Sequence, residues 1–263
     1  METTFWEQKL KELRSSIKAN SSTRETDNSQ YECKVCKDSE WIIDEKTNSA
    51  KPCKCREAKQ YQRILEASGI SEAFRKKTFN NFVVKNEQIK AARDMAIDYC
   101  RNFDAIRDTE HNSIAFLGQV GAGKTHLSIA IANELMKRNI GVRYMQYRED
   151  IMRIKQSAID EEAYAKEINK YKMATVLLID DLYKGAVHKN RMGHEYVNEA
   201  DLRAMFEIIN YRYLKKAPMI ISSEYTVDQL LDFDEAIGSR IIERCKGHII
   251  ELHGMELNYR LAN

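Results

Sequence analysis

Residues 118–125 have the spacing of a phosphate-binding loop, in which two glycines enclose four residues and are followed by Lys and Thr. Glycine lets backbone amides turn toward a phosphate, and the N-terminus of a following helix adds partial positive charge. In this pattern Lys124 reaches the β- and γ-phosphates of a nucleotide triphosphate, and Thr125 binds Mg²⁺. A glycine-rich turn before a helix is the alternative. The residues predicted to bind the nucleotide and its Mg²⁺ are Gly118, Gly121, Ala122, Gly123, Lys124, Thr125, His126 and Asp180.

A second group of reactive side chains ends an apolar run, where residues 175–179 are followed by Asp180 and Asp181. Such a run fits a central parallel strand, whose carboxyl end lies at the same sheet edge as a phosphate loop. We predict that Asp180 binds Mg²⁺, directly or through water, and that Asp181 orients and deprotonates the attacking water. Alternatively, the pair only caps a strand end. Asp181 is one methylene shorter than the more usual Glu, so we expect slow hydrolysis until a partner corrects the geometry.

Four of the six cysteines lie close together, at Cys33, Cys36, Cys53 and Cys55. Two closely spaced pairs of thiolates suit tetrahedral Zn²⁺ in a closed, structural site, and in a reducing compartment such clusters indicate metal more often than disulfides. We expect a hairpin that carries one pair at each end. The second pair has a single intervening residue, tighter than usual, and unrelated reduced thiols are the alternative.

The spacing of apolar residues predicts the elements that position these groups. Strands alternate with helices, which indicates a parallel sheet covered on both faces. In the helix expected over 200–216, we expect Phe206 to face inward and Arg212 to face outward. The predicted strands cover 113–117, 142–147, 175–179 and 219–223, and the helices 86–103, 126–137, 148–158, 161–171 and 200–216.

Composition describes an ordinary soluble chain of 263 residues with 43% hydrophobic residues and a net charge of +2. No apolar run approaches the ~20 residues that span a bilayer, and residues 1–7 lack the basic and apolar start of a signal peptide. We therefore expect a cytoplasmic protein with no membrane partner. The small net charge means that nucleic acid would be bound through local patches.

Two segments are candidates for binding a macromolecular partner. Residues 1–18 have an apolar stripe at helical spacing, which would pack on a partner or on the zinc module. Cations and aromatic rings alternate over residues 143–155, a combination that suits single-stranded nucleic acid. Core packing of the tyrosines and a solvated charged face are the alternatives. The candidate DNA-binding residues are Arg143, Tyr144, Tyr147, Arg148, Arg153 and Lys155.

Taken together, these features resemble the DnaC/DnaI-type replicative helicase loaders, including phage versions, which are AAA+ ATPases. The resemblance rests on the cysteines, the loop, the two aspartates, Gly238-Ser239-Arg240-Ile241, and residues 71–82, which we call the lead-in. It implies an α/β fold: an AAA+ P-loop core, a parallel sheet flanked by helices with a minimal or absent lid, preceded by a small zinc-binding module. The implied domains are 1–68, which docks on the helicase, and 69–263, the ATPase.

The resemblance also implies roles for three further residues. Ser223, or its neighbour Ser222, falls at the first sensor of the γ-phosphate, although the hydroxyls could instead satisfy backbone groups at the strand end. Arg240 looks like an arginine finger that completes a neighbouring subunit's site, which makes a homo-oligomer the expected active form. Arg260 matches the second sensor, acting in cis.

The function implied by the resemblance is an ATPase that loads a hexameric replicative DNA helicase onto single-stranded DNA, with ATP, Mg²⁺ and Zn²⁺ as cofactors. Three alternatives share parts of this pattern. They are a transposase-assisting AAA+ ATPase, a nucleotide-gated DNA-binding adaptor with little hydrolysis, and a small-molecule P-loop kinase. The spacing of Arg240 and Arg260 argues against the kinase.

Overall fold

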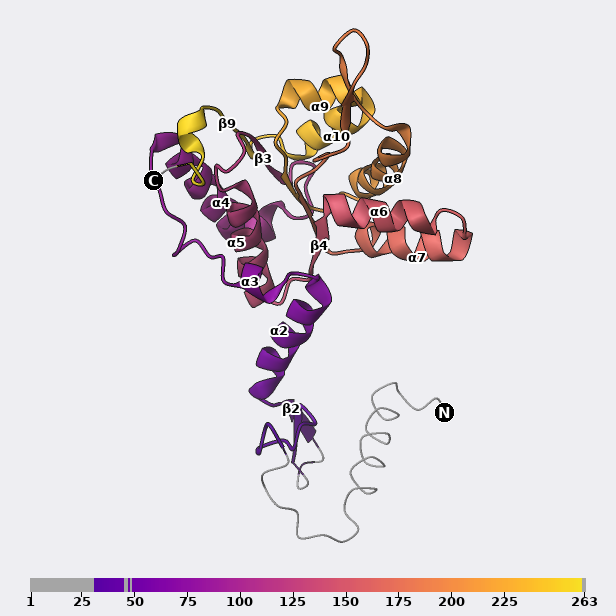
Figure 1. Cartoon of the computed structure of the whole chain (residues 1–263). Helices are drawn as coiled ribbons and strands as arrows, with labels where there is room; N and C mark the ends of the chain where they lie inside the picture. The colour runs from indigo at the N-terminus through magenta and orange to yellow at the C-terminus, as the bar shows by residue number, and fades with distance from the viewer. Residues whose placement is uncertain (1–30, 45–46, 48, 262–263) are drawn as a thin grey trace. The chain divides into compact units, whose positions relative to one another are not determined.

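The structure, a computed structural model, describes residues 31–44, 47 and 49–261. The chain divides into two compact units, 1–58 and 59–263 (Figure 1). The division falls within helix α2 (Cys55–Ser68), whereas the domain boundary predicted from the sequence lies at the end of that helix. The helix predicted over residues 1–18 lies outside the described residues.

The smaller unit contains the expected hairpin. Strands β1 (Trp41–Asp44) and β2 (Ser49–Pro52) pair antiparallel, with Trp41 opposite Pro52 and Asp44 opposite Ser49. The guanidinium of Arg56 lies 4.3 Å from the centroid of the Trp41 ring, which adds a cation–π contact beside the hairpin. Each end of the hairpin leads to one pair of cysteines, as the sequence predicted.

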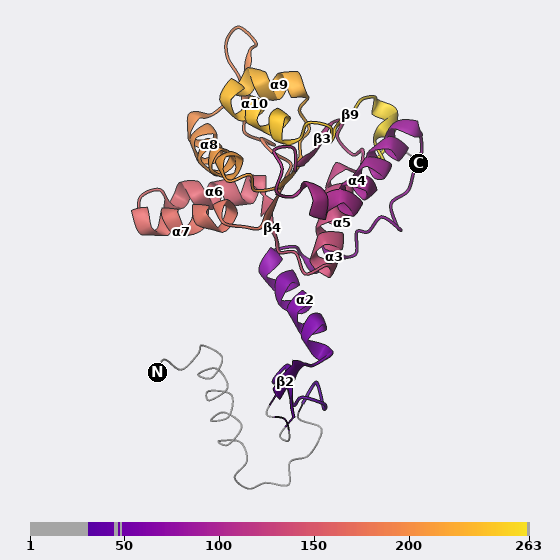
Figure 2. The same ribbon diagram turned by 180° about the vertical axis from the view of Figure 1, so that it is seen from behind.

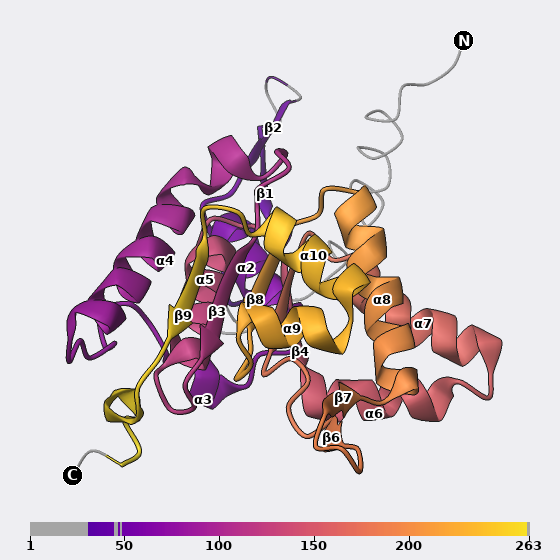
Figure 3. The same ribbon diagram turned by 90° about the horizontal axis from the view of Figure 1, so that it is seen from above.

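The larger unit is built on a five-stranded parallel sheet in the order β4-β5-β8-β3-β9. Figure 3 shows β9, β3, β8 and β4 succeeding one another across it. The strands are short and mostly apolar, as expected where both faces are covered. Their bounds are β3 (Ile114–Gly118), β4 (Val142–Gln146), β5 (Val176–Asp180), β8 (Met219–Ser222) and β9 (Ile249–Leu252).

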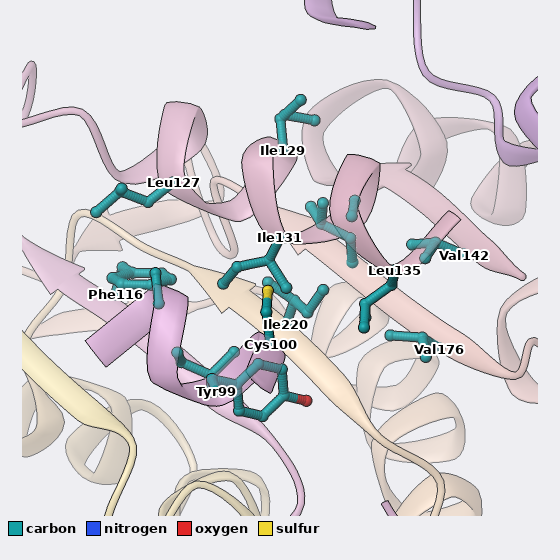
Figure 4. Packing of buried hydrophobic residues seen from close by; sticks show 14 of the residues in the cluster. Tyr99, Cys100, Phe116, Leu127, Ile129, Ile131, Leu135, Val142, Val176 and Ile220 are labelled. Carbon is teal, nitrogen blue, oxygen red and sulfur yellow. The ribbon is translucent and has the colours of Figure 1, made fainter. Parts of the chain in front are cut away.

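Helices cover the two faces of this sheet, as Figures 1 and 2 show from opposite sides. Along β3 the side chains alternate, so that Ile114 and Phe116 join one core cluster and Ala115 and Leu117 join the other. The first cluster lies under α4 (Glu87–Ile106) and α5 (Lys124–Lys137), and Figure 4 shows part of it. The second lies under α6 (Tyr147–Ser157), α7 (Glu161–Lys172), α8 (Glu199–Leu214), α9 (Val227–Phe233) and α10 (Glu235–Arg244).

Three shorter elements complete the described chain. Helix α3 (Glu72–Arg75) lies in the lead-in, and a hairpin of β6 (Val187–Lys189) and β7 (Glu195–Val197) follows the strand that ends at Asp180. A 3₁₀ turn, η1 (Met255–Leu257), follows β9. No helix in the part of the chain that the structure describes has the length and apolarity needed to cross a membrane.

Two side chains on α8 lie opposite to the prediction. Phe206 is 38% exposed, whereas Arg212 is fully buried. The Arg212 guanidinium donates hydrogen bonds to the carbonyls of Tyr171 (2.9 Å), Ala174 (2.8 Å) and Pro218 (2.7 Å). A buried cation persists only where acceptors surround it, and these come from the segments that precede β5 and β8. Helical spacing alone could not reveal them.

Candidate functional site: a nucleotide cavity and a cysteine cluster

A cavity of about 310 Å³ opens beside the phosphate loop. Its walls come from the loop and the start of α5, from the lead-in, from the turn after β5, and from the C-terminal segment. The residues that line it are Lys77, Asn81, Phe82, Val83, Val120, Gly121, Gly123, Lys124, Thr125, His126, Asp181, Lys184, Glu224, Tyr259 and Arg260.

The loop joins β3 to α5 in a conformation that requires glycine. Gly118 and Gly123 have φ angles of +90° and +88°, in the left-handed region. A Cβ on Gly118 would lie 2.4 Å from the Leu252 carbonyl oxygen of β9, and one on Gly123 would lie 2.7 Å from the Phe82 ring. No side chain caps the start of α5, so its first amides stay available to an anion.

Lys124 is held tightly against the loop. Its side chain is 5% exposed, and its Nζ donates to the carbonyls of Gly118 (2.6 Å) and Gln119 (2.7 Å). Burial lowers the pKa of this ammonium group to about 8, and Asp181 and Glu224 partly oppose that shift. Lys124 therefore still carries mostly positive charge at neutral pH.

Three hydroxyl groups converge on Asp180, which ends β5 and is 4% exposed. Thr125 Oγ1 (2.8 Å) and Ser222 Oγ (2.6 Å) donate to its Oδ1, and the Tyr144 hydroxyl donates to its Oδ2 at 3.0 Å. The pKa of Asp180 is raised overall, because burial and the neighbouring Asp181 outweigh these hydrogen bonds, which lower it. A carboxylate and a threonine hydroxyl at this spacing are the oxygen donors that Mg²⁺ takes, so the pair fits the predicted ion.

Asp181 faces the cavity from a left-handed backbone position, with φ of 57°. Its amide donates to Ser222 Oγ at 2.9 Å, and its Oδ2 lies 2.5 Å from Lys184 Nζ. The turn after β5 thus presents a carboxylate to the cavity together with its own cation. The sequence reasoning identified Asp181 but not Lys184.

The structure distinguishes the two serines that end β8. Ser222 bonds both to Asp180 and to the Asp181 amide, whereas the hydroxyl of fully buried Ser223 donates to the carbonyl of Leu182 at 2.8 Å. Ser222 therefore lies in the hydrogen-bond network of the site, and Ser223 satisfies a backbone group.

The two predicted arginines lie in different places. Arg260 lines the cavity, but Arg240 on α10 is not among the residues that line it. The Arg240 guanidinium donates to Asn210 Oδ1 at 3.0 Å and lies 5.3 Å and 5.4 Å from the rings of Phe206 and Tyr213. One chain does not bring Arg240 to its own cavity, and its role in a neighbouring site stays a prediction.

Most of the predicted loop residues line the cavity, among them His126. Its Nε2 lies 2.9 Å from the carbonyl oxygen of Thr78 and 3.1 Å from Asn81 Oδ1, which attaches the lead-in to α5. Ala122 is fully buried in the core cluster under α5, and Gly118 supports the loop from β3 without lining the cavity.

Sequence reasoning missed several lining residues beyond the loop. Phe82 packs against His126, with ring centroids 5.1 Å apart, and against Tyr259 at 6.3 Å. These rings give the cavity an apolar wall that suits a nucleobase. Lys77 and Glu224 also line it. Their positions in the sequence could have indicated them. Tyr259 precedes the predicted sensor Arg260, and Lys77 and Phe82 belong to the lead-in, which was expected to pack against the ATPase core.

The four cysteines of the smaller unit form one cluster, with all Sγ atoms within 4.8 Å of one another. The Sγ atoms of Cys33 and Cys53 are 3.8 Å apart, and those of Cys36 and Cys55 are 3.4 Å apart. Tetrahedral Zn–S bonds of about 2.3 Å place sulfurs about 3.8 Å apart, so the cluster fits zinc. Amide hydrogen bonds from Cys36 and Val35 lower the pKa of the Cys33 thiol, which favours the ligating thiolate, whereas burial raises the pKa of Cys55.

The proposed DNA-binding face on β4 and α6 lacks its aromatic part. Tyr144 and Tyr147 are 8% and 0% exposed, and their hydroxyls bond to Asp180 and Asp201. Lys155 also pairs with Asp201, at 2.5 Å. Of the two alternatives, core packing therefore holds for the tyrosines and stacking on bases does not, because buried carboxylates fix both rings inside the core.

Comparison with known proteins places these features in a family. Residues 9–263 match the family described as IstB-like ATP binding protein. In Bacillus subtilis (strain 168), the uncharacterized protein YqaM is 39% identical over 238 residues, which is 88% of this chain and 72% of that protein. The phage-like element PBSX protein XkdC of the same strain is 37% identical over 244 residues, which is 90% of this chain and 89% of XkdC.

Three solved structures share the fold. The DnaC helicase loader aligns with a TM-score of 0.53 and 19% identity, over 70% of this chain and all of that one. DnaI aligns with a TM-score of 0.52 and 22% identity, over 71% of this chain and 93% of the DnaI chain. The replication initiator DnaA bound to AMPPCP and single-stranded DNA aligns with a TM-score of 0.54 and 23% identity, over 70% of this chain and about half (51%) of that one. Because the family match spans nearly the whole chain, the chain belongs to the IstB-like ATP-binding proteins, and its fold is the AAA+ P-loop fold.

Proposed function

We propose that the protein is an ATP-dependent loader that binds a hexameric replicative DNA helicase and helps to place it on single-stranded DNA. The observation that carries the proposal is the convergence of Lys124, Thr125 and Asp180 beside one cavity, in a chain that also contains a four-cysteine unit. The DnaC and DnaI structures share its fold, and the DnaA structure of that fold was solved with an ATP analogue and single-stranded DNA.

The residues at the cavity divide the work of ATP hydrolysis. Lys124 and the uncapped amides of α5 bind phosphate oxygens, and Thr125 and Asp180 hold Mg²⁺. Bound Mg²⁺ neutralises negative charge on the transferred phosphoryl group. The rings of Phe82 and Tyr259 offer an apolar surface to the base.

Asp181 is the group that orients the attacking water and accepts its proton. Its Oδ2 already lies 2.5 Å from Lys184 Nζ, so this cation competes with the attacking water for the carboxylate. Hydrolysis by the isolated chain is therefore slow in our account. Arg240 of a neighbouring subunit supplies the remaining positive charge, so turnover rises on assembly.

The smaller unit is assigned to helicase docking. Within this unit, the hairpin and its cysteines form a module of roughly thirty residues, which cannot bury enough apolar surface to fold alone, and zinc bound by four thiolates would supply the missing stability. A closed structural site of this kind has no open position for catalysis, which leaves its surface for recognition.

Size-exclusion chromatography with light scattering tests the proposal. The chain is mixed with the hexameric replicative helicase of Bacillus subtilis, the organism of both relatives, with and without ATP. We expect a complex heavier than the hexamer, which then retains a fluorescent single-stranded oligonucleotide in ATP. In the Lys124→Ala variant, we expect that ATP no longer increases retention of the oligonucleotide. Absence of any complex would overturn the loader assignment, and salt-insensitive DNA binding would argue against a groove that binds phosphates.

A further inference from the structure

Lys77 lies in the lead-in, outside the phosphate loop, yet its backbone is fixed on the helix that follows the loop. Its carbonyl accepts a hydrogen bond from Asn133 Nδ2 of α5 at 2.8 Å, and its amide donates to the Phe74 carbonyl at 2.9 Å. The next carbonyl, that of Thr78, lies 2.9 Å from His126 Nε2. These contacts set the position of Lys77 relative to the nucleotide cavity.

Lys77 is among the residues that line that cavity, and within the described residues its ammonium group has no carboxylate partner. Its Nζ lies 4.1 Å from the centroid of the Phe74 ring, and it makes no ion pair with any residue in the described ranges. The other lysines of the cavity are engaged, because Lys184 pairs with Asp181 and Lys124 bonds to loop carbonyls. A half-buried cation without a counter-charge is costly unless an anion joins it.

Lys77 lies on the side of the cavity that adjoins Asp180, because its Nζ lies over the Phe74 ring, which packs edge-on against Tyr144, and the Tyr144 hydroxyl bonds to Asp180. Burial lowers the pKa of its ammonium group, Asp180 and Asp181 raise it, and Arg260 lowers it. Of these groups, Asp180 is assigned to Mg²⁺ and Asp181 to the attacking water. Lys77 therefore lies at the phosphate end of the cavity.

We propose that Lys77 binds the terminal phosphate of the bound nucleotide triphosphate, so that the lead-in itself distinguishes ATP from ADP. The inference rests on the proposed ATP binding and adds a ligand contact from outside the loop and the sensor positions. The same segment touches the site at a second point. Phe74 of α3 packs edge-on against Tyr144, with centroids 6.0 Å apart, and Tyr144 bonds to Asp180.

As a consequence, loss of the γ-phosphate would change how the lead-in is attached to the core. In the triphosphate complex, Lys77 is paired with an anion and the lead-in is attached through Lys77, His126 and Asn133. With the diphosphate, the Lys77 attachment is missing while the backbone contacts to His126 and Asn133 persist.

Isothermal titration calorimetry of the full chain with AMPPCP and with ADP, both in Mg²⁺, tests the assignment. We expect Lys77→Gln to weaken AMPPCP binding about 10- to 100-fold, as for a lost charge-assisted hydrogen bond, and to leave ADP affinity within about threefold. Lys77→Arg should recover most of the loss. Lys76→Gln is the matched control, because this neighbouring lysine is exposed and does not line the cavity.

The outcomes separate this inference from the proposed function. If wild-type protein binds AMPPCP and Lys77→Gln binds it equally well, the Lys77 assignment is wrong and ATP binding stands. Equal losses for AMPPCP and ADP, with a lowered melting temperature in the absence of nucleotide, would mean a structural role and also overturn the assignment. If wild-type protein binds neither nucleotide, both the inference and the proposed function fail.

Discussion

Removing the Tyr144 hydroxyl probes how the protein holds its metal-binding aspartate. The Tyr144→Phe change deletes one oxygen from a ring that is 8% exposed and that donates to Asp180 Oδ2 at 3.0 Å. Thr125 and Ser222 would still donate to Oδ1, so the carboxylate would lose one of its three hydroxyl partners.

Two magnitudes follow from this geometry. A hydrogen bond to a charged, buried carboxylate contributes about 1.5–3 kcal/mol, so unfolding free energy should fall by about that amount at pH 8. The hydroxyl stabilises the ionised form of Asp180. The difference in unfolding free energy between variant and wild type should therefore narrow as pH falls through the raised pKa of Asp180. Loss of a group that orients a metal ligand typically costs about 10- to 100-fold in metal affinity or activity.

The stability assay is urea unfolding followed by circular dichroism, because both tryptophans, Trp6 and Trp41, precede residue 59 and do not report on the larger unit. Nucleotide affinity is measured in Mg²⁺ and in EDTA, and only the Mg²⁺ value should fall. Tyr171→Phe is the control, since this buried tyrosine lines a cavity beside Tyr144 and its hydroxyl makes no hydrogen bond within the described residues.

If Tyr144→Phe matched wild type both in stability at pH 8 and in Mg²⁺-dependent affinity, the hydroxyl would not support Asp180 and the reasoning would be refuted. An equal loss of nucleotide affinity in EDTA would show that the change acts on the cavity in general and not through the metal.

Three further predictions test other parts of the molecule. The purified chain should contain about one zinc per chain by atomic absorption, which Cys36→Ser should lose and Cys100→Ser should keep; a zinc-free wild-type protein would contradict the cluster assignment. Gly193→Ala should lower the free energy of unfolding by about 1–2 kcal/mol, because alanine is strained at this left-handed backbone position. Gly123→Ala should lower it further and also weaken ATP binding, because here the added Cβ also meets the Phe82 ring. Equal losses for the two variants in urea unfolding would count against the contact between Gly123 and Phe82. Arg240→Ala should keep ATP binding and lower assembly-dependent turnover by roughly 10³-fold or more, and full turnover at high protein concentration would exclude a finger in trans.

The sequence was most informative where the relevant contacts are local. The loop is specified by consecutive residues, and strand β5 by an apolar run that ends in two aspartates, so both were predicted within a residue or two. The cysteine cluster was likewise predicted from spacing, including Cys55, whose pair is unusually tight.

Features that depend on distant partners were missed or misassigned. Strand β9 has only four residues, and its place beside β3 follows from pairing across more than a hundred residues of chain. For Tyr144 the sequence left DNA binding and core packing open, because a strand pattern does not reveal that its hydroxyl meets Asp180. Arg212 was expected outside because its carbonyl acceptors come from other segments. Lys77 gave no signal of its own, since it reaches the cavity only through the attachment of the lead-in to α5.

The most direct test of the account is ATP binding by the intact chain. Calorimetric titration of Mg²⁺·ATP should show saturable binding of one nucleotide per chain, and Lys124→Ala should abolish it, because the change removes the ammonium group that the loop carbonyls hold beside the cavity. Wild-type protein that shows no saturable binding up to about 1 mM, the upper end of the usual range for substrates, would contradict the account, as would unchanged affinity in Lys124→Ala.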